Sequence, residues 1–186
     1  MEYLAEQHVA GIIERAKHGD HDAFSWLYTT YFTQVYRYAY YRTGSAADAE
    51  DITQSVFLRA YESIGRYSHR GISPLAYFYT IARNAVIDHR RKKQVGVMPD
   101  EQLSTVVDSR DSPEENASRG YEGEYVRSKI RLLPEEQQEV VTLKFINELS
   151  NAEIAAILNK SEDAVRQLQS RGLRSLRTFL INDHEY

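Results

Sequence analysis

The sequence predicts an all-α protein, and three observations support this fold class. Apolar residues recur at intervals of three and four along most of the chain, as they do on one face of a helix. Sustained alternation of apolar and polar residues, which marks strands, is almost absent. Helix-start signals also precede several apolar stretches, as at Ser73-Pro74 and Ser112-Pro113.

The first 93 residues are expected to form a bundle of helices. Gly19 and Gly44 end the first two helices, because glycine readily takes the left-handed conformation of a helix C-cap. A third helix starts at Ser45 and stops near Gly65, and a fourth runs from Pro74 to about Lys93. Their expected buried faces are Val9, Ile12, Ile13 and Ala16; Phe24, Leu27, Tyr28, Tyr31, Phe32, Val35 and Ala39; Ala49, Ile52, Val56, Phe57 and Ala60; and Phe78, Ile81 and Ala85 with much of Tyr79, Ala82 and Val86.

A change of composition divides the chain into two small helical domains. Residues 94–111 lose the helical stripe and carry four acids against one base, which predicts a flexible acidic linker. The predicted domains are therefore residues 1–93 and 112–186. In the second domain, helices are expected over residues 113–132, 134–146, 150–158 and 161–180.

Composition excludes several classes of function. The 186 residues include no cysteine, which removes disulfides, thiolate metal ligands and cysteine nucleophiles. No apolar run approaches the roughly 18 residues of a spanning helix, so we expect no membrane insertion and a cytoplasmic protein. The six histidines show no paired helical spacing, and no phosphate loop or nucleophile elbow occurs. We therefore expect no enzyme, no cofactor and no bound metal.

Charge is unevenly distributed on this acidic chain, whose formal net charge is -4. The segment from Arg83 to Lys93 has five basic residues against one acid, and that from Lys160 to Arg177 has five against two. Two basic patches on an acidic chain are typical of a protein with two DNA contacts and an additional protein partner.

A helix-turn-helix is the strongest motif, between Leu149 and Leu176. Ser150 and Glu153 form a capping box, Asn159 suits a left-handed turn, and Ser161 caps the second helix. The predicted buried face of that helix is Val165, Leu168, Gly172, Leu173 and Leu176. The side chains left outward, which can donate to phosphates and base edges, are Arg166, Gln167, Gln169, Ser170, Arg171 and Arg174.

The helix from Leu75 to Lys93 has a second polar face that includes Tyr77, Thr80, Asn84 and Arg91. This stripe offers an aromatic ring and an amide to bases, and a basic end to the backbone. A solvated face beside an ordinary core explains the same pattern equally well.

These segments together resemble extracytoplasmic-function (ECF) sigma factors of the sigma-70 family. The resemblance is carried, in order and spacing, by the string from Asp48 to Ala60 and the helix from Tyr77 to Lys93, then by Ser112-Pro-Glu-Glu, Leu133-Pro-Glu and the helix-turn-helix. It covers roughly residues 9–182. It implies a region 2 bundle and a region 4 helix-turn-helix, with core RNA polymerase, promoter DNA and an anti-sigma factor as partners.

The resemblance also implies a role for individual positions. Contact with the core polymerase is implied for Asp48, Asp51, Gln54 and Phe57. Capture of an unpaired minus-ten base is implied for Arg66, His69, Arg70, Tyr77, Thr80, Arg83, Asn84 and Arg91. Reading of the minus-35 duplex is implied for Ser161, Arg166, Gln167, Gln169, Ser170, Arg171 and Arg174. The chain departs from the family pattern at Tyr77, where tryptophan is usual, and at Leu168 and Gln169, where arginine and leucine are common.

Two other functions explain parts of the same sequence. A helix-turn-helix regulator that never joins the polymerase accounts for the second domain but leaves the acidic and basic helices of the first domain without a role. Such a regulator binds duplex promoter as a dimer, so strand-selective binding of an unpaired minus-ten sequence separates the two hypotheses. A protein-only adaptor would have no affinity for DNA.

Overall fold

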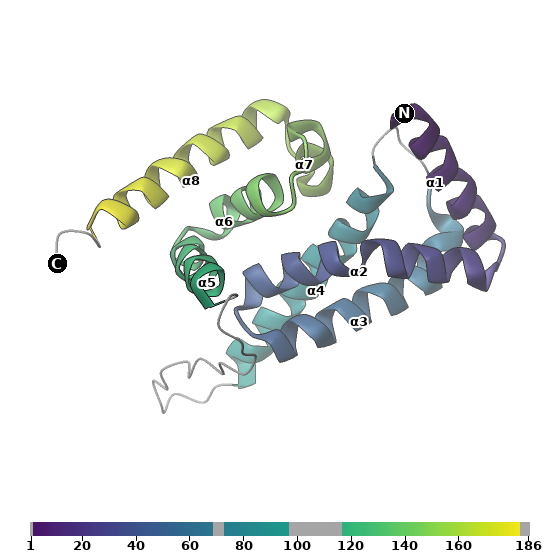
Figure 1. Cartoon of the computed structure of the whole chain (residues 1–186), viewed down its shortest axis with the longest axis horizontal. Helices are drawn as coiled ribbons and strands as arrows, with labels where there is room; N and C mark the ends of the chain where they lie inside the picture. The colour runs from purple at the N-terminus through teal and green to yellow at the C-terminus, as the bar shows by residue number, and fades with distance from the viewer. Residues whose placement is uncertain (1, 69–72, 97–116, 183–186) are drawn as a thin grey trace.

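The computed structural model describes residues 2–68, 73–96 and 117–182, with side chains for 8–68, 73–93 and 123–181. Every regular element in these ranges is helical, so the all-α prediction is confirmed (Figure 1). In chain order the elements are α1 (Glu2–Lys17), α2 (His21–Thr43), α3 (Ala46–Ser63), η1 (Ile64–Arg66), α4 (Pro74–Gly96), α5 (Ala117–Arg131), α6 (Glu135–Val141), η2 (Thr142–Ile146), α7 (Asn151–Leu158) and α8 (Glu162–Asn182).

Local capping chemistry sets the helix ends in the first bundle, α1 to α4. Asp20 precedes α2 and its carboxylate accepts from the Ala23 amide at 3.0 Å. Gly44 ends α2 with φ 76°, a left-handed conformation that costs glycine little. Ser45 follows at once and caps α3 by accepting from the Asp48 amide at 3.2 Å. These two adjacent residues make the sharp turn that lays α3 against α2.

The core of the first bundle lies where α2, α3 and α4 meet. Tyr38, Phe78, Tyr79 and Leu27 are among the largest fully buried side chains. Most residues of the predicted stripes are buried there, whereas Tyr28 is 40% exposed and packs its ring at a tilt against that of Phe57, with centroids 4.8 Å apart.

The second bundle runs from α5 to α8 and depends on a close approach of two helices. A side chain at Gly172 of α8 would place its Cβ 2.8 Å from Cγ2 of Val141 on α6. Any larger residue at this crossing would force the Val141 side chain to shift, which explains why a glycine stands on this buried face. The predicted helix over 134–146 is interrupted, because a π-helical turn, η2, replaces its second half.

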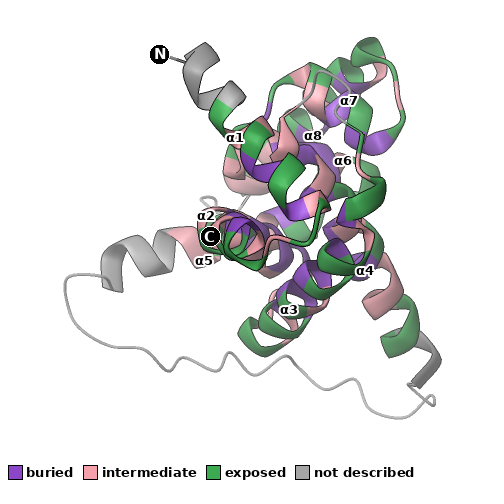
Figure 2. Ribbon diagram, turned by 90° about the vertical axis from the view of Figure 1, so that its right-hand side faces the viewer, coloured by how far each residue is buried: buried purple, intermediate pink, exposed green. Residues whose placement is uncertain are grey.

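The two bundles pack on one another and share a continuous apolar core. Leu143 and Ile154 of the second bundle are fully buried in the same cluster as Val35 and Val86 of the first. Helix α7 lies against α4, and η2 lies against α2. Buried segments accordingly run through both groups of helices in Figure 2.

Two sequence predictions need correction or qualification. Leu173, predicted on the buried face of α8, is 43% exposed, because it lies one residue, or about 100°, away from Gly172 around the helix. The predicted linker began at residue 94, but α4 continues to Gly96. The rest of the linker and the Ser112-Pro113 signal lie outside the described residues.

Candidate nucleic-acid interface

The helix-turn-helix is formed by α7 and α8, with the predicted caps. Ser150 and Glu153 make the capping box, in which the serine accepts from the Glu153 amide at 3.2 Å and the Glu153 carboxylate accepts from the Ser150 amide at 2.8 Å. Asn159 ends α7 in the left-handed conformation, with φ 52°. Ser161 then accepts from the Ala164 amide at 3.2 Å and starts α8.

The outer face of α8 presents most of the side chains predicted to read DNA. Arg166, Gln167, Ser170, Arg171 and Arg174 are exposed, as is Ser161, whereas Gln169 is half-buried.

Two of the arginines on this face differ in their electrostatic surroundings. Arg166 forms ion pairs with Asp163 and with Glu162, and the hydrogen bond that Arg166 donates to Asp163 raises the pKa of Arg166. Arg171, by contrast, has no ion-pair partner within the described part of the chain. Its guanidinium is therefore free to form two parallel hydrogen bonds to a base or phosphate.

A cavity of about 410 Å³ opens beside η1 and the first turns of α4. Its lining residues are Ser63, Arg66, Tyr67, Ser68, Ser73, Ala76, Tyr77, Thr80, Ala156 and Ile157. Three of the predicted minus-ten residues, Arg66, Tyr77 and Thr80, therefore meet in one pocket. The Tyr67 ring, absent from the prediction, lies edge-on to the Tyr77 ring with centroids 5.0 Å apart. Tyr67 follows η1 and lies outside the helices, where the spacing of apolar residues gives no signal that would have revealed this contact.

The other predicted minus-ten residues are distributed differently. Asn84 and Arg91 are exposed on later turns of α4, outside the cavity. Arg83 instead lines a second cavity of about 210 Å³ beside Glu135, Glu139 and Lys160 of the second bundle. The Arg83 side chain faces the acidic start of α6 in this conformation, and the expected contact of Arg83 with DNA stays a prediction. His69 and Arg70 lie outside the described residues.

The predicted docking face of α3 divides into exposed and structural residues. Asp51 and Gln54 are exposed. Phe57 is 3% exposed and packs against Phe78, so its assignment as a surface contact needs correction: an aromatic ring in the core is not available to a partner. Asp48 lies 3.3 Å from His89 Nε2 and 3.5 Å from Lys93 Nζ, and thus ties α3 to α4.

Asp88 lies next to the polar stripe of α4 and forms ion pairs with two arginines. Its carboxylate lies 3.4 Å from Arg91 and 3.7 Å from Arg59 of α3. These partners offset the repulsion that a free carboxylate would exert on a phosphate.

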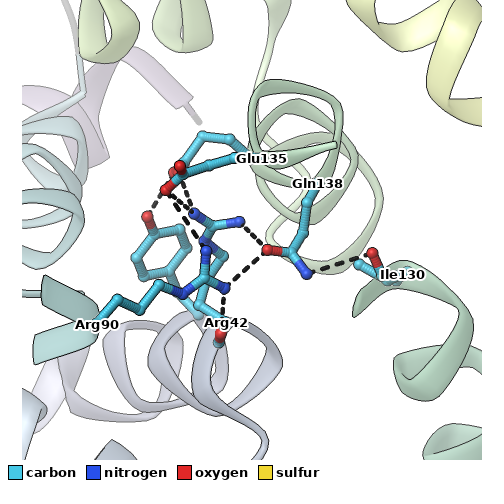
Figure 3. Close-up of polar contacts among 7 residues, drawn as sticks. Arg42, Arg90, Ile130, Glu135 and Gln138 are labelled. Carbon is cyan, nitrogen blue, oxygen red and sulfur yellow. Dashed lines mark hydrogen bonds and ion pairs between the residues drawn. The ribbon is translucent and has the colours of Figure 1, made fainter. Parts of the chain in front are cut away.

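A buried polar cluster joins the two bundles (Figure 3). Arg42 of α2, whose side chain is fully buried, lies 2.9 Å from the Glu139 carboxylate of α6 and also donates to Gln138. The Tyr38 hydroxyl donates to Glu139. Arg90 of α4 donates to Gln138 at 2.8 Å and to the Arg42 carbonyl at 2.5 Å. The cluster therefore connects α2, α4 and α6 through charge-assisted hydrogen bonds.

Burial shifts the pKa values of two groups in this cluster, Tyr38 and Arg90. Burial, reinforced by the negative charge of Glu139, holds the pKa of Tyr38 well above its usual value. Burial, together with the neighbouring charge of Arg42, lowers the pKa of Arg90. Tyr38 is therefore a neutral phenol that donates to the carboxylate of Glu139. Arg42 has two carboxylate partners, the buried Glu139 at 2.9 Å and the exposed Glu135 at 3.5 Å.

Further polar contacts extend this junction along α2. The Asn147 amide donates to the Gln34 carbonyl at 3.0 Å and to the Tyr79 hydroxyl at 2.7 Å. The Arg127 guanidinium lies 3.9 Å from the centroid of the Tyr40 ring, a cation–π distance. Sequence reasoning missed these residues, because each partner is distant in the chain.

No helix among the described residues combines the length and the apolarity needed to cross a membrane. The same part of the chain contains no group of three or more histidine, aspartate or glutamate side chains placed to hold a metal ion.

The comparisons with known proteins agree with this geometry. Residues 27–95 match the family model for Sigma-70 region 2, and residues 123–176 match that for Sigma-70, region 4. The chain is 40% identical to the ECF RNA polymerase sigma factor BldN of Streptomyces coelicolor, over 92% of this chain and 66% of BldN. It is 33% identical to the ECF RNA polymerase sigma factor SigW of Bacillus subtilis, over 90% of this chain and 94% of SigW.

A solved structure shares the fold. CnrH, solved in complex with the cytosolic domain of CnrY, superposes with a TM-score of 0.72 at 22% identity, over 92% of this chain and 96% of that one. The helix-turn-helix and the α4 pocket, on two packed helical bundles, define the class as a two-domain DNA-binding protein. The matches in both bundles then make the identification specific: the chain belongs to the ECF RNA polymerase sigma factors.

Proposed function

We propose that this sigma factor uses α3 to dock on core RNA polymerase, the α4 pocket to hold an unpaired base of the minus-ten element, and the outer face of α8 to read the minus-35 duplex. One observation carries the proposal. The chain presents a cavity lined by Arg66, Tyr77 and Thr80 of the first bundle, and an exposed arginine-rich face on α8 of the second, as two separate promoter elements require. A regulator that acts without the polymerase needs only the exposed face of α8.

Contact with the polymerase is assigned to the exposed face of α3. Asp51 and Gln54 lie on that face with their side chains accessible. Asp48 serves it indirectly by fixing α3 against His89 and Lys93 of α4. A rigid α3 presents Asp51 and Gln54 in one geometry, which reduces the entropy lost on binding.

Entry of a DNA strand into the pocket requires the two bundles to separate. Ala156 and Ile157 of α7 form one wall of the pocket, whereas the reading face of α8 is exposed in the same conformation. We therefore propose that the free protein is closed and that the polymerase binds an open form, with residues 1–93 and 112–186 acting as separate domains and 94–111 as their linker. We therefore expect the free protein to bind promoter DNA weakly.

A protein regulator of the anti-sigma kind completes the proposal. The structure of CnrH was solved with the cytosolic domain of CnrY, and another chain of this fold, the sigma factor RpoE, was solved with the anti-sigma factor NepR. A regulator that favours the closed form would prevent docking without covering every DNA contact. We place the protein in the cytoplasm and assign it no catalytic activity of its own.

Run-off transcription tests this function directly. Core RNA polymerase and genomic promoter fragments are combined with and without the purified protein. Specific starts that appear only with the protein establish a sigma factor and supply both promoter elements. Absence of transcripts together with absence of binding to core polymerase would replace the proposal with the regulator hypothesis.

A further inference from the structure

The pocket beside α4 contains hydroxyl groups whose hydrogen-bond directions are fixed by the fold. Ser63 Oγ lies 2.5 Å from the Arg59 carbonyl oxygen, which can only accept, so the single proton of this serine points to Arg59. Tyr77 Oη lies 2.7 Å from the same Ser63 Oγ and must therefore be the donor of that pair. The second acceptor near the phenol, the Ala60 carbonyl at 3.4 Å, lies on α3 as well.

The phenol of Tyr77 thus faces the pocket only as an acceptor. A hydroxyl has one proton and two lone pairs, and the proton of Tyr77 is used on α3. Burial raises the pKa of Tyr77, so the phenol keeps this proton under ordinary conditions. The pocket therefore meets the oxygen lone pairs and the ring of Tyr77.

Thr80, one helical turn later, also faces the pocket only as a hydrogen-bond acceptor. Its Oγ1 donates to the Ala76 carbonyl at 2.9 Å, which uses its only proton within the helix. Tyr77 and Thr80, three residues apart on α4, both line the cavity, so this wall of the pocket offers two acceptors.

The loop side of the pocket supplies donors. Arg66 has donors and no acceptor. Ser73 Oγ accepts from the Leu75 amide at 3.3 Å, which leaves its proton free for a ligand. Acceptors on α4 and donors on the loop complement a base edge that has an amino group next to an unprotonated ring nitrogen. Adenine and cytosine present that edge, whereas thymine and guanine present a carbonyl next to an N–H.

We propose that Tyr77 and Thr80 make this pocket selective for an unpaired adenine or cytosine, and that Ser63 is the positioning residue that fixes the polarity of Tyr77. The inference rests on the proposed function, because it assumes that the pocket receives a base of the minus-ten strand.

The test uses holoenzyme, assembled from core polymerase and the full chain, on a promoter found by run-off transcription. Abasic substitutions along the non-template strand of the minus-ten element first locate the base that is held. Templates are then prepared with each of the four bases at that position. Two further templates carry purine, which is adenine without its amino group, or 2-pyrimidinone, which is cytosine without its amino group. Open-complex formation is measured for each template.

Wild-type holoenzyme should favour adenine and cytosine over thymine and guanine by about fivefold, and removal of the amino group should cost a similar factor. In Tyr77→Phe or Thr80→Val, which each lose an acceptor, that cost should fall below about twofold. In Ser63→Ala, Tyr77 keeps only the long contact of 3.4 Å to the Ala60 carbonyl, so its proton can turn to the pocket and should bring thymine and guanine within about twofold of the preferred bases. Tyr61→Phe, which removes an exposed phenol outside the pocket, is the matched control and should behave as wild type.

The outcomes separate this inference from the function on which it rests. Specific transcription with equal use of the four bases, or an amino-group cost that Tyr77→Phe leaves unchanged, overturns the selectivity and leaves the sigma function standing. Absence of specific transcription, or of any position sensitive to base removal, overturns both. Thr80→Val retains the test if Ser63→Ala fails to fold.

Discussion

Arg42 and Glu139 form an ion pair of 2.9 Å across the junction of the two bundles, and both side chains are almost completely removed from solvent. Removal of one partner from such a pair leaves a buried charge without its countercharge, which costs about 3–5 kcal/mol. The pair is thus a strong determinant of whether the bundles stay docked. Because the pair joins α2 to α6, it favours the closed form over the open form that is proposed to admit DNA to the α4 pocket.

Glu139→Gln should open the protein. The substitution keeps the shape of the side chain but removes the nearer and buried carboxylate of Arg42 and leaves only the exposed Glu135 at 3.5 Å, so the closed form loses stability relative to the separated bundles. The radius of gyration from small-angle scattering should rise, with helix content by circular dichroism unchanged. Glu136→Gln is the control, because Glu136 pairs on the surface with Lys160 of its own bundle. An unchanged radius for Glu139→Gln would contradict the role of the pair.

A reversible lock across the junction of the two bundles should block promoter opening. The chain has no cysteine, so Ile87→Cys and Lys160→Cys, which line the second cavity and lie outside the base pocket, can be joined selectively by a bismaleimide that contains a disulfide. The crosslinked protein should lose specific transcription and regain it when a reductant cleaves the linker. Singly substituted proteins treated with the same reagent are the controls. Full activity in the locked state would show that separation of α4 and α7 is unnecessary.

Asp51 and Asp48 should respond differently to alanine. Asp51→Ala should weaken binding to core polymerase with little change in thermal stability, because Asp51 is exposed on α3. Asp48→Ala should lower the free energy of unfolding by about 0.5–1 kcal/mol, since it removes partly exposed ion pairs to His89 and Lys93. Binding titrations with labelled protein and urea unfolding measure the two effects, and the reverse pattern would overturn the assignment.

Arg171→Ala should weaken binding to the matched minus-35 duplex by about 1–3 kcal/mol. Arg166→Ala should cost less, because Arg166 must first give up its ion pairs with Asp163 and Glu162. Holoenzyme affinity for promoter variants at each minus-35 position provides the measurement. A loss that is equal on all sequences would mark Arg171 as a phosphate contact instead of a base contact.

Tyr31 should make stability decline at alkaline pH. Burial raises the pKa of Tyr31 to about 12, whereas an unfolded tyrosine titrates near about 10. The folded form holds the proton more tightly, so this contribution is complete below the unfolded pKa and is lost as pH rises through the folded one. Above about pH 10, wild type should lose up to about 1.4 kcal/mol per pH unit more than Tyr31→Phe in urea unfolding. Parallel pH profiles would refute this.

The parts of the fold that could be predicted from sequence depend on residues close together in the chain. Ser150 and Glu153 cap each other across one turn, and Gly44 and Asn159 end helices through their own backbone preferences. The burial of Glu139 was not predictable in this way. Its partner Arg42 lies in the other bundle, and a charged residue on a helix is ordinarily on a solvated face.

Sequence reasoning was least reliable for residues that fit two roles, one in the packing of the fold and one in contact with a partner. Phe57 belongs both to the apolar stripe of α3 and to the segment that resembles the polymerase-docking surface, and the core requires it. Arg83 belongs to a basic patch, yet it faces the acidic start of α6 because the second bundle packs there. In both cases tertiary packing decided between two uses of one helix face.

The wall that α7 contributes to the α4 pocket has a further consequence. Ala156 and Ile157 belong to the same chain as the pocket, so under the proposed function α7 competes with DNA for that space as a tethered ligand. Its effective concentration is fixed by chain connectivity and does not fall when the protein is dilute. A higher concentration of the protein therefore does not weaken the competition between α7 and DNA within each molecule. Only a partner that binds the open form can relieve that competition.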